Sequence, residues 1–173
     1  CVRDSRGTDF YLIDDLQGAH KYAANGPIPG LLVRRCAGVF VTSNETSFNL
    51  RLVDYAVRHG KKVFFDATAY GATRRYLKDV IPKCNTVFGN TFEIALVMKA
   101  FDVANVSELF CVSQNISEIV VEDKIACTVE IYQRELEKPL KVGPLAVNER
   151  VSSVGCCDGI AAGYVALRSQ GYD

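Results

Sequence analysis

Short apolar runs alternate with helix-forming segments along most of the chain. This alternation is the sequence feature that most restricts the folds that the chain can adopt. Four continuous apolar runs have the length of buried strands, at residues 36–41, 62–66, 86–89 and 119–121. Helical patterns follow the first three of these runs, over residues 42–59, 73–80 and 91–100. A repeated strand–helix order predicts an α/β fold with a parallel sheet.

Weaker signals complete the expected elements. Residues 10–13 are another strand candidate, the alternating pattern of 124–132 suits a strand, and 141–144 favours one more. A last helix continues from Asp158 and stops at Gly171. The sequence has no internal repeat, linker or low-complexity segment. We therefore expect residues 1–173, which suffice for a sizeable core, to form one domain.

Composition excludes several classes of partner. The formal net charge is zero, so no basic surplus favours nucleic acid, and no apolar stretch is long enough to span a bilayer. The seven cysteines include no Cys-x-x-Cys pair, and there are only two histidines, which argues against a zinc site. We expect a reducing, cytoplasmic location. The chain starts with a cysteine, so we also expect it to begin inside a larger protein.

The stretch 152–164 is typical of a loop that turns directly into a helix; it reads Ser-Ser-Val-Gly-Cys-Cys-Asp-Gly-Ile-Ala-Ala-Gly-Tyr. Gly155 permits backbone conformations that a Cβ disfavours, and the first N–H groups of a helix favour an anion. Asp158 is placed to act as a base beside a bound phosphate. An ordinary junction with Asp158 as helix cap explains the same residues, so both interpretations remain open here.

Polar side chains follow the predicted strands at a common edge of the sheet. Asp66 ends one apolar run, and Asn90 and Glu93 follow the next. In parallel sheets, ligands bind outside the carboxyl ends of the strands. We therefore expect these three residues to converge in space with the loop at 155–158.

Four short stretches occur in order along nearly the whole chain. They are Leu-Gln-Gly-Ala-His-Lys-Tyr at 16–22, Val-Phe-Val-Thr-Ser-Asn-Glu-Thr at 39–46, Val-Phe-Gly-Asn-Thr-Phe-Glu at 87–93, and Ser-Ser-Val-Gly-Cys-Cys-Asp at 152–158. Together they resemble motifs of the ribokinase (PfkB) family of sugar and nucleoside kinases, and within it the adenosine kinases. The last stretch resembles that family's Asp-Thr-Asn/Thr-Gly-Ala-Gly-Asp.

The resemblance implies a ribokinase-like three-layer α/β fold with a mostly parallel central sheet, from which the family's N-terminal part and lid are missing. It implies an adenosine-kinase-like phosphotransferase of purine salvage, with ATP and Mg²⁺ as cofactors and a nucleoside such as adenosine as the acceptor. The γ-phosphate would move to the nucleoside 5′-hydroxyl by in-line transfer. Nucleic acid and membrane are not expected partners.

The same resemblance assigns roles to individual residues. Asp158 matches the catalytic base, which takes the proton from the acceptor hydroxyl. Asn90 and Glu93 match the Asn-x-x-Glu motif, which organises the magnesium ion through its waters. The anion hole, which stabilises charge on the transferred phosphoryl group, matches the backbone N–H groups of Gly155, Cys156, Cys157 and Asp158.

Departures from the family pattern concentrate around the phosphates. Cys157 replaces the second glycine of Gly-Ala-Gly-Asp, and Phe10 falls where adenosine kinases have an arginine. Residues 122–127, Glu-Asp-Lys-Ile-Ala-Cys, stand where the family has Thr-x-Gly-x-x-Gly, so both glycines are lost and acidic side chains are added. At 65–68, Phe-Asp-Ala-Thr replaces a Leu-Asn-Leu-Ser type of sequence.

These departures leave two alternatives to an active nucleoside kinase. The first is a catalytically impaired pseudokinase, a binding or structural component of a larger assembly with protein partners. The second is a sugar kinase of the same family. Because the family's upstream substrate site and its final helices have no counterpart in the sequence, we expect either a fragment of a longer protein or a shortened relative.

Overall fold

The structure, a computed structural model, describes residues 2–3, 9–10, 25–43, 47–68, 73–143 and 156–172. A six-stranded sheet in the order β3-β4-β5-β6-β7-β8 forms its centre. The first four strands are parallel and the last two antiparallel to their neighbours: β3 (Gly38–Thr42), β4 (Lys62–Asp66), β5 (Thr86–Asn90), β6 (Glu118–Asp123), β7 (Thr128–Gln133) and β8 (Leu140–Val142). A separate antiparallel pair joins β1 (Val2–Arg3) to β2 (Asp9–Phe10). The predicted α/β class with a mostly parallel sheet is confirmed.

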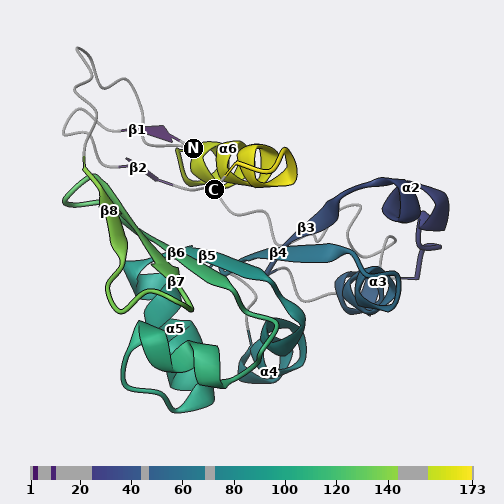
Figure 1. Cartoon of the computed structure of the whole chain (residues 1–173), viewed down its shortest axis with the longest axis horizontal. Helices are drawn as coiled ribbons and strands as arrows, with labels where there is room; N and C mark the ends of the chain where they lie inside the picture. Colours follow the sequence, from purple (N-terminus) through teal and green to yellow (C-terminus); the bar gives the residue numbers. More distant parts are fainter. Residues whose placement is uncertain are drawn as a thin grey trace.

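Helices cover both faces of the sheet, which gives the predicted three layers (Figure 1). Parallel strands that are consecutive in the sequence are neighbours in the sheet, so right-handed crossovers place their connecting helices on one face. The helical elements are α2 (Gly30–Arg35), α3 (Ser47–Arg58), α4 (Arg74–Val80), η1 (Ile81–Lys83), α5 (Thr91–Phe101), η2 (Val106–Cys111) and α6 (Cys156–Ser169). Figure 1 shows α4 and α5 on one side of the sheet and α6 on the other.

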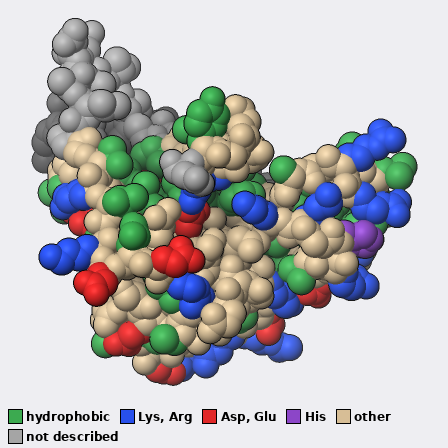
Figure 2. All heavy atoms as spheres, viewed as in Figure 1, with side chains coloured by type: hydrophobic (Ala, Val, Ile, Leu, Met, Phe, Trp, Pro, Cys, Tyr) green, Lys and Arg blue, Asp and Glu red, His purple; other side chains and the backbone are tan. Residues whose placement is uncertain are grey.

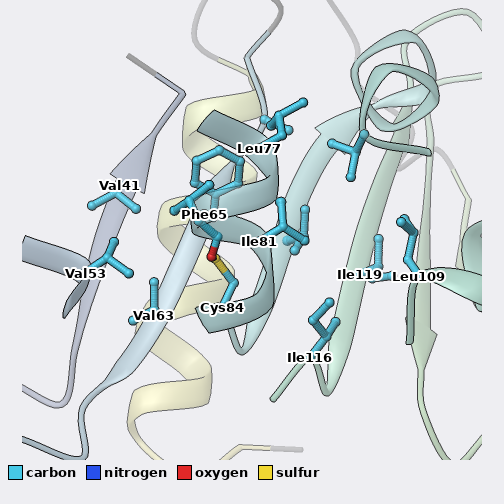
Figure 3. Close-up of a cluster of buried hydrophobic side chains, with 14 of the residues drawn as sticks. Val41, Val53, Val63, Phe65, Leu77, Ile81, Cys84, Leu109, Ile116 and Ile119 are labelled. Carbon is cyan, nitrogen blue, oxygen red and sulfur yellow. The ribbon is translucent and has the colours of Figure 1, made fainter. Parts of the chain in front are cut away.

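Alternation along the strands divides the apolar side chains between two clusters. Val63 and Phe65 of β4, Val87 of β5 and Ile119 of β6 belong to the large core beneath α3, α4 and α5, part of which Figure 3 shows. The residues between them face α6 instead. Phe64, Phe88 and Val120 form a smaller cluster with Ala161, which Tyr164 and Val165 extend. Because successive side chains of a strand point to opposite faces, each face of the sheet has its own apolar cluster.

The helix ends follow from local capping chemistry. The Thr73 side chain accepts a hydrogen bond from the Tyr76 backbone N–H at 3.2 Å and starts α4. Gly60, with a φ of +64°, lies just beyond the end of α3, and His59 stacks on Tyr55. These contacts confirm the predicted start of α4 and the predicted end of α3. The start expected at residue 42 is wrong, because Thr42 still belongs to β3 and α3 begins at Ser47.

Part of the predicted secondary structure is wrong or lies outside the described residues. The strand expected over 124–132 begins only at Thr128, because Lys124–Cys127 form a turn in which the Asp123 side chain accepts two backbone hydrogen bonds. The helical segments α2 and η2 were not predicted. Residues 11–24 and 144–155, which hold the first resembling stretch and most of the last, lie outside the described residues.

Charge is distributed unevenly over a protein of zero net charge. Figure 2 shows Asp and Glu side chains interspersed with Lys and Arg over the β6–α5 part of the face in view, whereas Lys and Arg predominate over α2 and α3. The latter include Arg34, Arg35 and Arg58 at the two helix ends. Among the described helices, none is both long and apolar enough to cross a membrane.

Ile119→Ala should lower the free energy of unfolding by about 2–5 kcal/mol, because Ile119 is fully buried in the central strand β6 and its truncation leaves a cavity. Chemical denaturation measures the effect. The matched control is Ile125→Ala in the β6–β7 turn, where the side chain is 98% exposed and the same truncation should change stability by less than about 0.5 kcal/mol. Equal losses in the two variants would contradict this core.

Candidate active site

Three polar residues occupy the carboxyl ends of the central parallel strands. Asp66 ends β4, Asn90 ends β5, and Glu122 is the last residue but one of β6. The strand register pairs Asn90 of β5 with Glu122 of β6, so these two residues are direct neighbours across the sheet. Asp66 of β4 is paired with Phe88, which lies two residues before Asn90 in β5. Asp66 and Glu122 follow Phe64 and Val120 by two positions and therefore lie on the face that α6 covers.

The helix α6 is fixed at both ends against this face. Near its C-terminus, Arg168 forms an ion pair with Glu118, at the start of β6. In its middle, Ala161 and Tyr164 pack on the apolar centre of the strands. Its first turn, which contains Cys157 and Asp158, consequently lies at the carboxyl ends. The predicted convergence of Asp66, Glu93 and the start of the last helix is confirmed.

Asn90 and Glu93 form a capping box at the start of α5. The Asn90 side-chain oxygen accepts hydrogen bonds from the backbone N–H groups of Phe92 (2.9 Å) and Glu93 (3.0 Å). The Glu93 carboxylate accepts one from the Asn90 N–H at 2.8 Å. This reciprocal pair stabilises the helix start. It also fixes Glu93 at the sheet edge, where its charge acts on Asp66.

Asp66 is the most strongly perturbed carboxyl group of the site. Only 5% of the residue is exposed. Burial raises the pKa of Asp66 to about 7, and the negative charges of Glu93 and Asp158 contribute to the rise. Glu122 adds to it, while Lys124 opposes it. Near neutral pH, Asp66 is therefore divided between its protonated and ionised forms.

Cys157 joins the start of α6 to the end of β6. Its thiol lies close enough to Glu122 and Lys124 for these two side chains to alter its pKa. Burial raises the pKa of Cys157 to about 12, and Glu122 raises it further. Burial likewise raises the pKa of Glu122, against the lowering effect of the nearby Cys157 thiol. Cys157 is thus a protonated thiol at neutral pH.

The first turn of α6 has the backbone arrangement of an anion site. The helix starts at Cys156, so the N–H groups of Cys156, Cys157 and Asp158 have no acceptor within the helix. Their dipoles favour negative charge at this end. Gly155, the fourth predicted member of the anion hole, lies outside the described residues, as does the Cys156 side chain.

The acidic residues of the site suit a magnesium ion held largely through water. Among the described residues, no group of three His, Cys, Asp or Glu side chains comes together as a metal site. Magnesium keeps several waters in nucleotide sites and uses only one or two carboxylates. Glu93 and Asp66, which interact electrostatically, offer such carboxylates beside the strand ends.

Sequence reasoning missed the contribution of three residues. Asp66 was predicted to converge with the site, but its raised pKa depends on burial that the sequence does not show. Glu122 and Lys124 were identified only as departures from a motif. They lie near Cys157 only because β6 pairs with β5 and α6 packs across these strands. No local sequence pattern predicts this tertiary arrangement.

The β6–β7 turn contains one residue in a backbone conformation that favours glycine, although the turn has no glycine. Cys127 has a φ of +52°, in the left-handed region that favours glycine. It stands at the second glycine position of the Thr-x-Gly-x-x-Gly pattern. The Asp123 side chain accepts hydrogen bonds from the backbone of Ile125 and Ala126, both at 2.9 Å, and holds the turn. The turn therefore forms without a glycine at either of the two positions.

Comparison of the fold with solved structures identifies its type. The chain is similar to a ribokinase from Thermotoga maritima, with a TM-score of 0.76 at 17% identity over 99% of this chain and 55% of the other. It is also similar to a nucleoside kinase of the ribokinase family from Methanocaldococcus jannaschii (TM-score 0.75, 18% identity, 91% of this chain and 50% of the other). A third similar structure is an Anopheles gambiae adenosine kinase in complex with a di(adenosine) tetraphosphate (TM-score 0.69, 15% identity, 83% of this chain and 47% of the other).

These similarities show that the chain has a ribokinase-type fold. The chain spans about half the length of the solved structures it matches. No protein-family model matches the sequence, and no curated protein matches it. The fold expected from the resemblance is confirmed, whereas the roles of individual residues remain predictions.

Asp66→Asn should stabilise the protein near and above neutral pH. The folded protein keeps the Asp66 proton up to about pH 7, whereas the unfolded chain releases it near the ordinary pKa of 3.8. Between these values the folded state binds the extra proton, so wild-type stability falls as the pH rises and levels off above 7. The amide does not titrate. Denaturation at several pH values should show the advantage of the variant growing by about 2–4 kcal/mol from about pH 4 to about pH 8.

The control for Asp66→Asn is Asp79→Asn, whose side chain is exposed on α4 and whose stability curve should follow the wild type. A difference between Asp66→Asn and the wild type that does not change with pH would contradict the raised pKa.

Cys127→Gly should raise the free energy of unfolding by about 0.5–1 kcal/mol. Glycine removes the steric cost of the left-handed conformation, and the greater freedom of the unfolded chain offsets only part of this gain. Cys127→Ala keeps the Cβ and should leave stability nearly unchanged. Thermal and chemical denaturation of both variants provide the measurement, and a glycine variant less stable than the alanine variant would disprove strain at this turn.

Proposed function

We propose that the chain carries the phosphoryl-transfer site of an adenosine-kinase-type enzyme, which moves the γ-phosphate of ATP to the 5′-hydroxyl of a nucleoside. One observation carries the proposal. In a ribokinase-type fold, Asp158 lies in the first turn of α6, and that turn meets the carboxyl ends of the central strands. Ligands of parallel sheets bind at this edge.

Each step of the transfer has a group to perform it. The Asp158 carboxylate takes the proton from the acceptor hydroxyl as its oxygen attacks the γ-phosphorus. The N–H groups at the start of α6 donate to the phosphoryl oxygens and stabilise the charge that develops on them. ADP leaves on the opposite side of the phosphorus. The protein acts mainly by positioning and electrostatics, as is general for phosphoryl transfer.

Asn90, Glu93 and Asp66 would hold a hydrated magnesium ion beside the phosphates. When bound, Mg²⁺ neutralises part of the negative charge of the nucleotide. Asn90 keeps Glu93 at the sheet edge through the capping box. Asp66 contributes a full negative charge only when ionised, which links its proton to the occupancy of this position.

A second candidate is a pseudokinase that has kept the fold as a binding or structural component. A specific feature favours it: the Glu122 carboxylate lies close enough to Cys157, at an anion-hole position, to raise the pKa of its thiol. A carboxylate held there repels phosphate. A sugar kinase is a further alternative within the same fold, since the Thermotoga maritima structure is a ribokinase.

Asp158→Asn should abolish most ATP-dependent phosphorylation of adenosine, with kcat lower by about a hundredfold to ten-thousandfold, because the amide cannot take the proton. The assay follows labelled phosphate into the nucleoside, with ribose tested in parallel as the sugar acceptor. Asp79→Asn on α4 is the matched control and should retain the wild-type rate.

The outcomes separate the three candidates. Adenosine phosphorylation that the Asp158 variant loses supports the nucleoside kinase, and turnover of ribose in its place supports the sugar kinase. A wild-type protein that neither transfers phosphate nor binds ATP in calorimetry would refute both in favour of the pseudokinase.

A further inference from the structure

The amino ends of the central strands surround a cavity of about 260 Å³, at the opposite end of the sheet from the candidate active site. The first residues of β4 and β5, Lys62 and Thr86, line it, as does the last residue of β7, Gln133. The end of α6 and the residues after it contribute Arg168 and Tyr172. The proposed function leaves this cavity without a role.

The strand register places a row of side chains along the floor of this cavity. Thr86 pairs with Phe64 of β4 on one side and with Glu118 of β6 on the other. Glu118 in turn pairs with Gln133 of β7. Residues paired in this way point to the same face of a sheet, and Phe64 belongs to the cluster under α6. Lys62 precedes Phe64 by two positions, so it lies on the same face as the row.

Glu118, at the centre of this row, is bound within the protein. It is 5% exposed and forms an ion pair with Arg168. Its Oε2 accepts a hydrogen bond from Arg168 Nε at 3.3 Å, and its Oε1 accepts one from Gln133 Nε2 at 3.1 Å. Arg168 also donates to the Tyr172 carbonyl oxygen at 2.9 Å. This network is a charge-balanced wall, so the recognition of a ligand is left to the groups around it.

Polar groups on either side of this wall lack partners of their own. Among the described residues, none forms a hydrogen bond or an ion pair with the side chain of Lys62, Thr86 or Glu135, all of which line the cavity. Thr86 is only 2% exposed, and a buried hydroxyl that lacks a hydrogen bond carries a free-energy cost. Gln133 donates its amide N–H to Glu118, which leaves its side-chain oxygen as an acceptor. These groups favour a ligand that completes their hydrogen bonds.

The available donors and acceptors are separated across the sheet. The donors, the Lys62 ammonium and the Thr86 hydroxyl, belong to the adjacent strands β4 and β5. The acceptors, the Gln133 carbonyl and the Glu135 carboxylate, lie at and just beyond the end of β7. Because β5 and β7 are two strands apart, their backbones are separated by roughly 10 Å, a gap that the side chains shorten. A phosphate would face the Glu135 carboxylate and a metal cation the Lys62 ammonium, whereas a molecule with one charge of each sign satisfies both.

We propose that this cavity binds a small zwitterion of the amino-acid class, with its carboxylate at Lys62 and Thr86 and its ammonium at Glu135. The rings of Phe64 and Tyr172 also line the cavity and offer apolar surface to the carbon atoms of the ligand. Cavities for drug-sized ligands start at roughly 300 Å³, so a volume of about 260 Å³ suits a single amino acid better than a nucleotide. The site lies at the far end of the sheet from the start of α6 and does not rest on the proposed function.

Calorimetry with each of the standard L-amino acids at millimolar concentration should find at least one that binds the wild-type protein. Lys62→Met and Glu135→Gln each remove one charge from an exposed position, and each should weaken that binding about tenfold, because a charge-assisted hydrogen bond is lost. Thr86→Val keeps the shape of the side chain without the hydroxyl. It should also weaken binding, while chemical denaturation shows the free protein to be at least as stable as the wild type.

Lys141→Met and Glu137→Gln are the matched controls, because both residues are exposed and neither lines the cavity. They should bind the amino acid as the wild type does. Blocked forms of the same amino acid test the recognition of both charges. Its N-acetyl derivative lacks the ammonium and its amide lacks the carboxylate, so each should bind about tenfold more weakly than the free amino acid. Equal binding of the free and blocked forms would contradict a zwitterion site.

The binding readout does not depend on phosphoryl transfer. Asp158→Asn alters the other end of α6 and should leave amino-acid binding unchanged, whatever its effect on the transfer assay. If no amino acid binds the wild type, the proposal is refuted. If one binds but Lys62→Met and Glu135→Gln both bind it equally well, the ligand lies elsewhere and the proposal is again refuted.

Discussion

The packing of α6 on the middle of β4, β5 and β6 determines where the first turn of α6 lies relative to the polar residues at the strand ends. Each strand presents an apolar side chain at its centre to this helix, namely Phe64, Phe88 and Val120. The ion pair between Arg168 and Glu118 fixes one end of the helix at the start of β6. The helix rises about 17 Å from residue 157 to 168, close to the roughly 13 Å that separates residues 118 and 122 along the strand. Its first turn therefore reaches the strand ends, and a shift of one helical turn would remove Asp158 from Asp66.

The same packing creates an electrostatic conflict that the protein has to resolve. Burying Asp66 beside Glu93 and Asp158 favours a proton on Asp66, and burial also raises the pKa of Glu122. Protonation of these carboxyl groups thus removes part of the repulsion. A change of pH alters this protonation. A kinase and a pseudokinase would differ in how readily this arrangement opens to phosphate.

The sequence was sufficient for the four parallel strands and for the convergence of polar side chains at their carboxyl ends. Apolar runs gave β3 to β6, and the residues after them, Asp66 and Glu93, converge as expected at the carboxyl ends. Local patterns failed where tertiary structure decides. The turn at Lys124–Cys127 interrupts an alternating pattern because Asp123 binds the following backbone. Glu122 and Cys157 are far apart in the sequence, and only the strand order and the crossing of α6 bring them together.

The left-handed backbone at Cys127 bears on how such proteins are recognised. A motif written in letters treats the glycine as its defining character, yet here a cysteine adopts the left-handed backbone that favours glycine. A search that scores residue identity does not match this position to a glycine, whereas a comparison of backbone dihedral angles does. Divergent chains of this fold would then be found more readily by asking which residues tolerate a positive φ, at a small energetic cost, than by asking where glycine occurs.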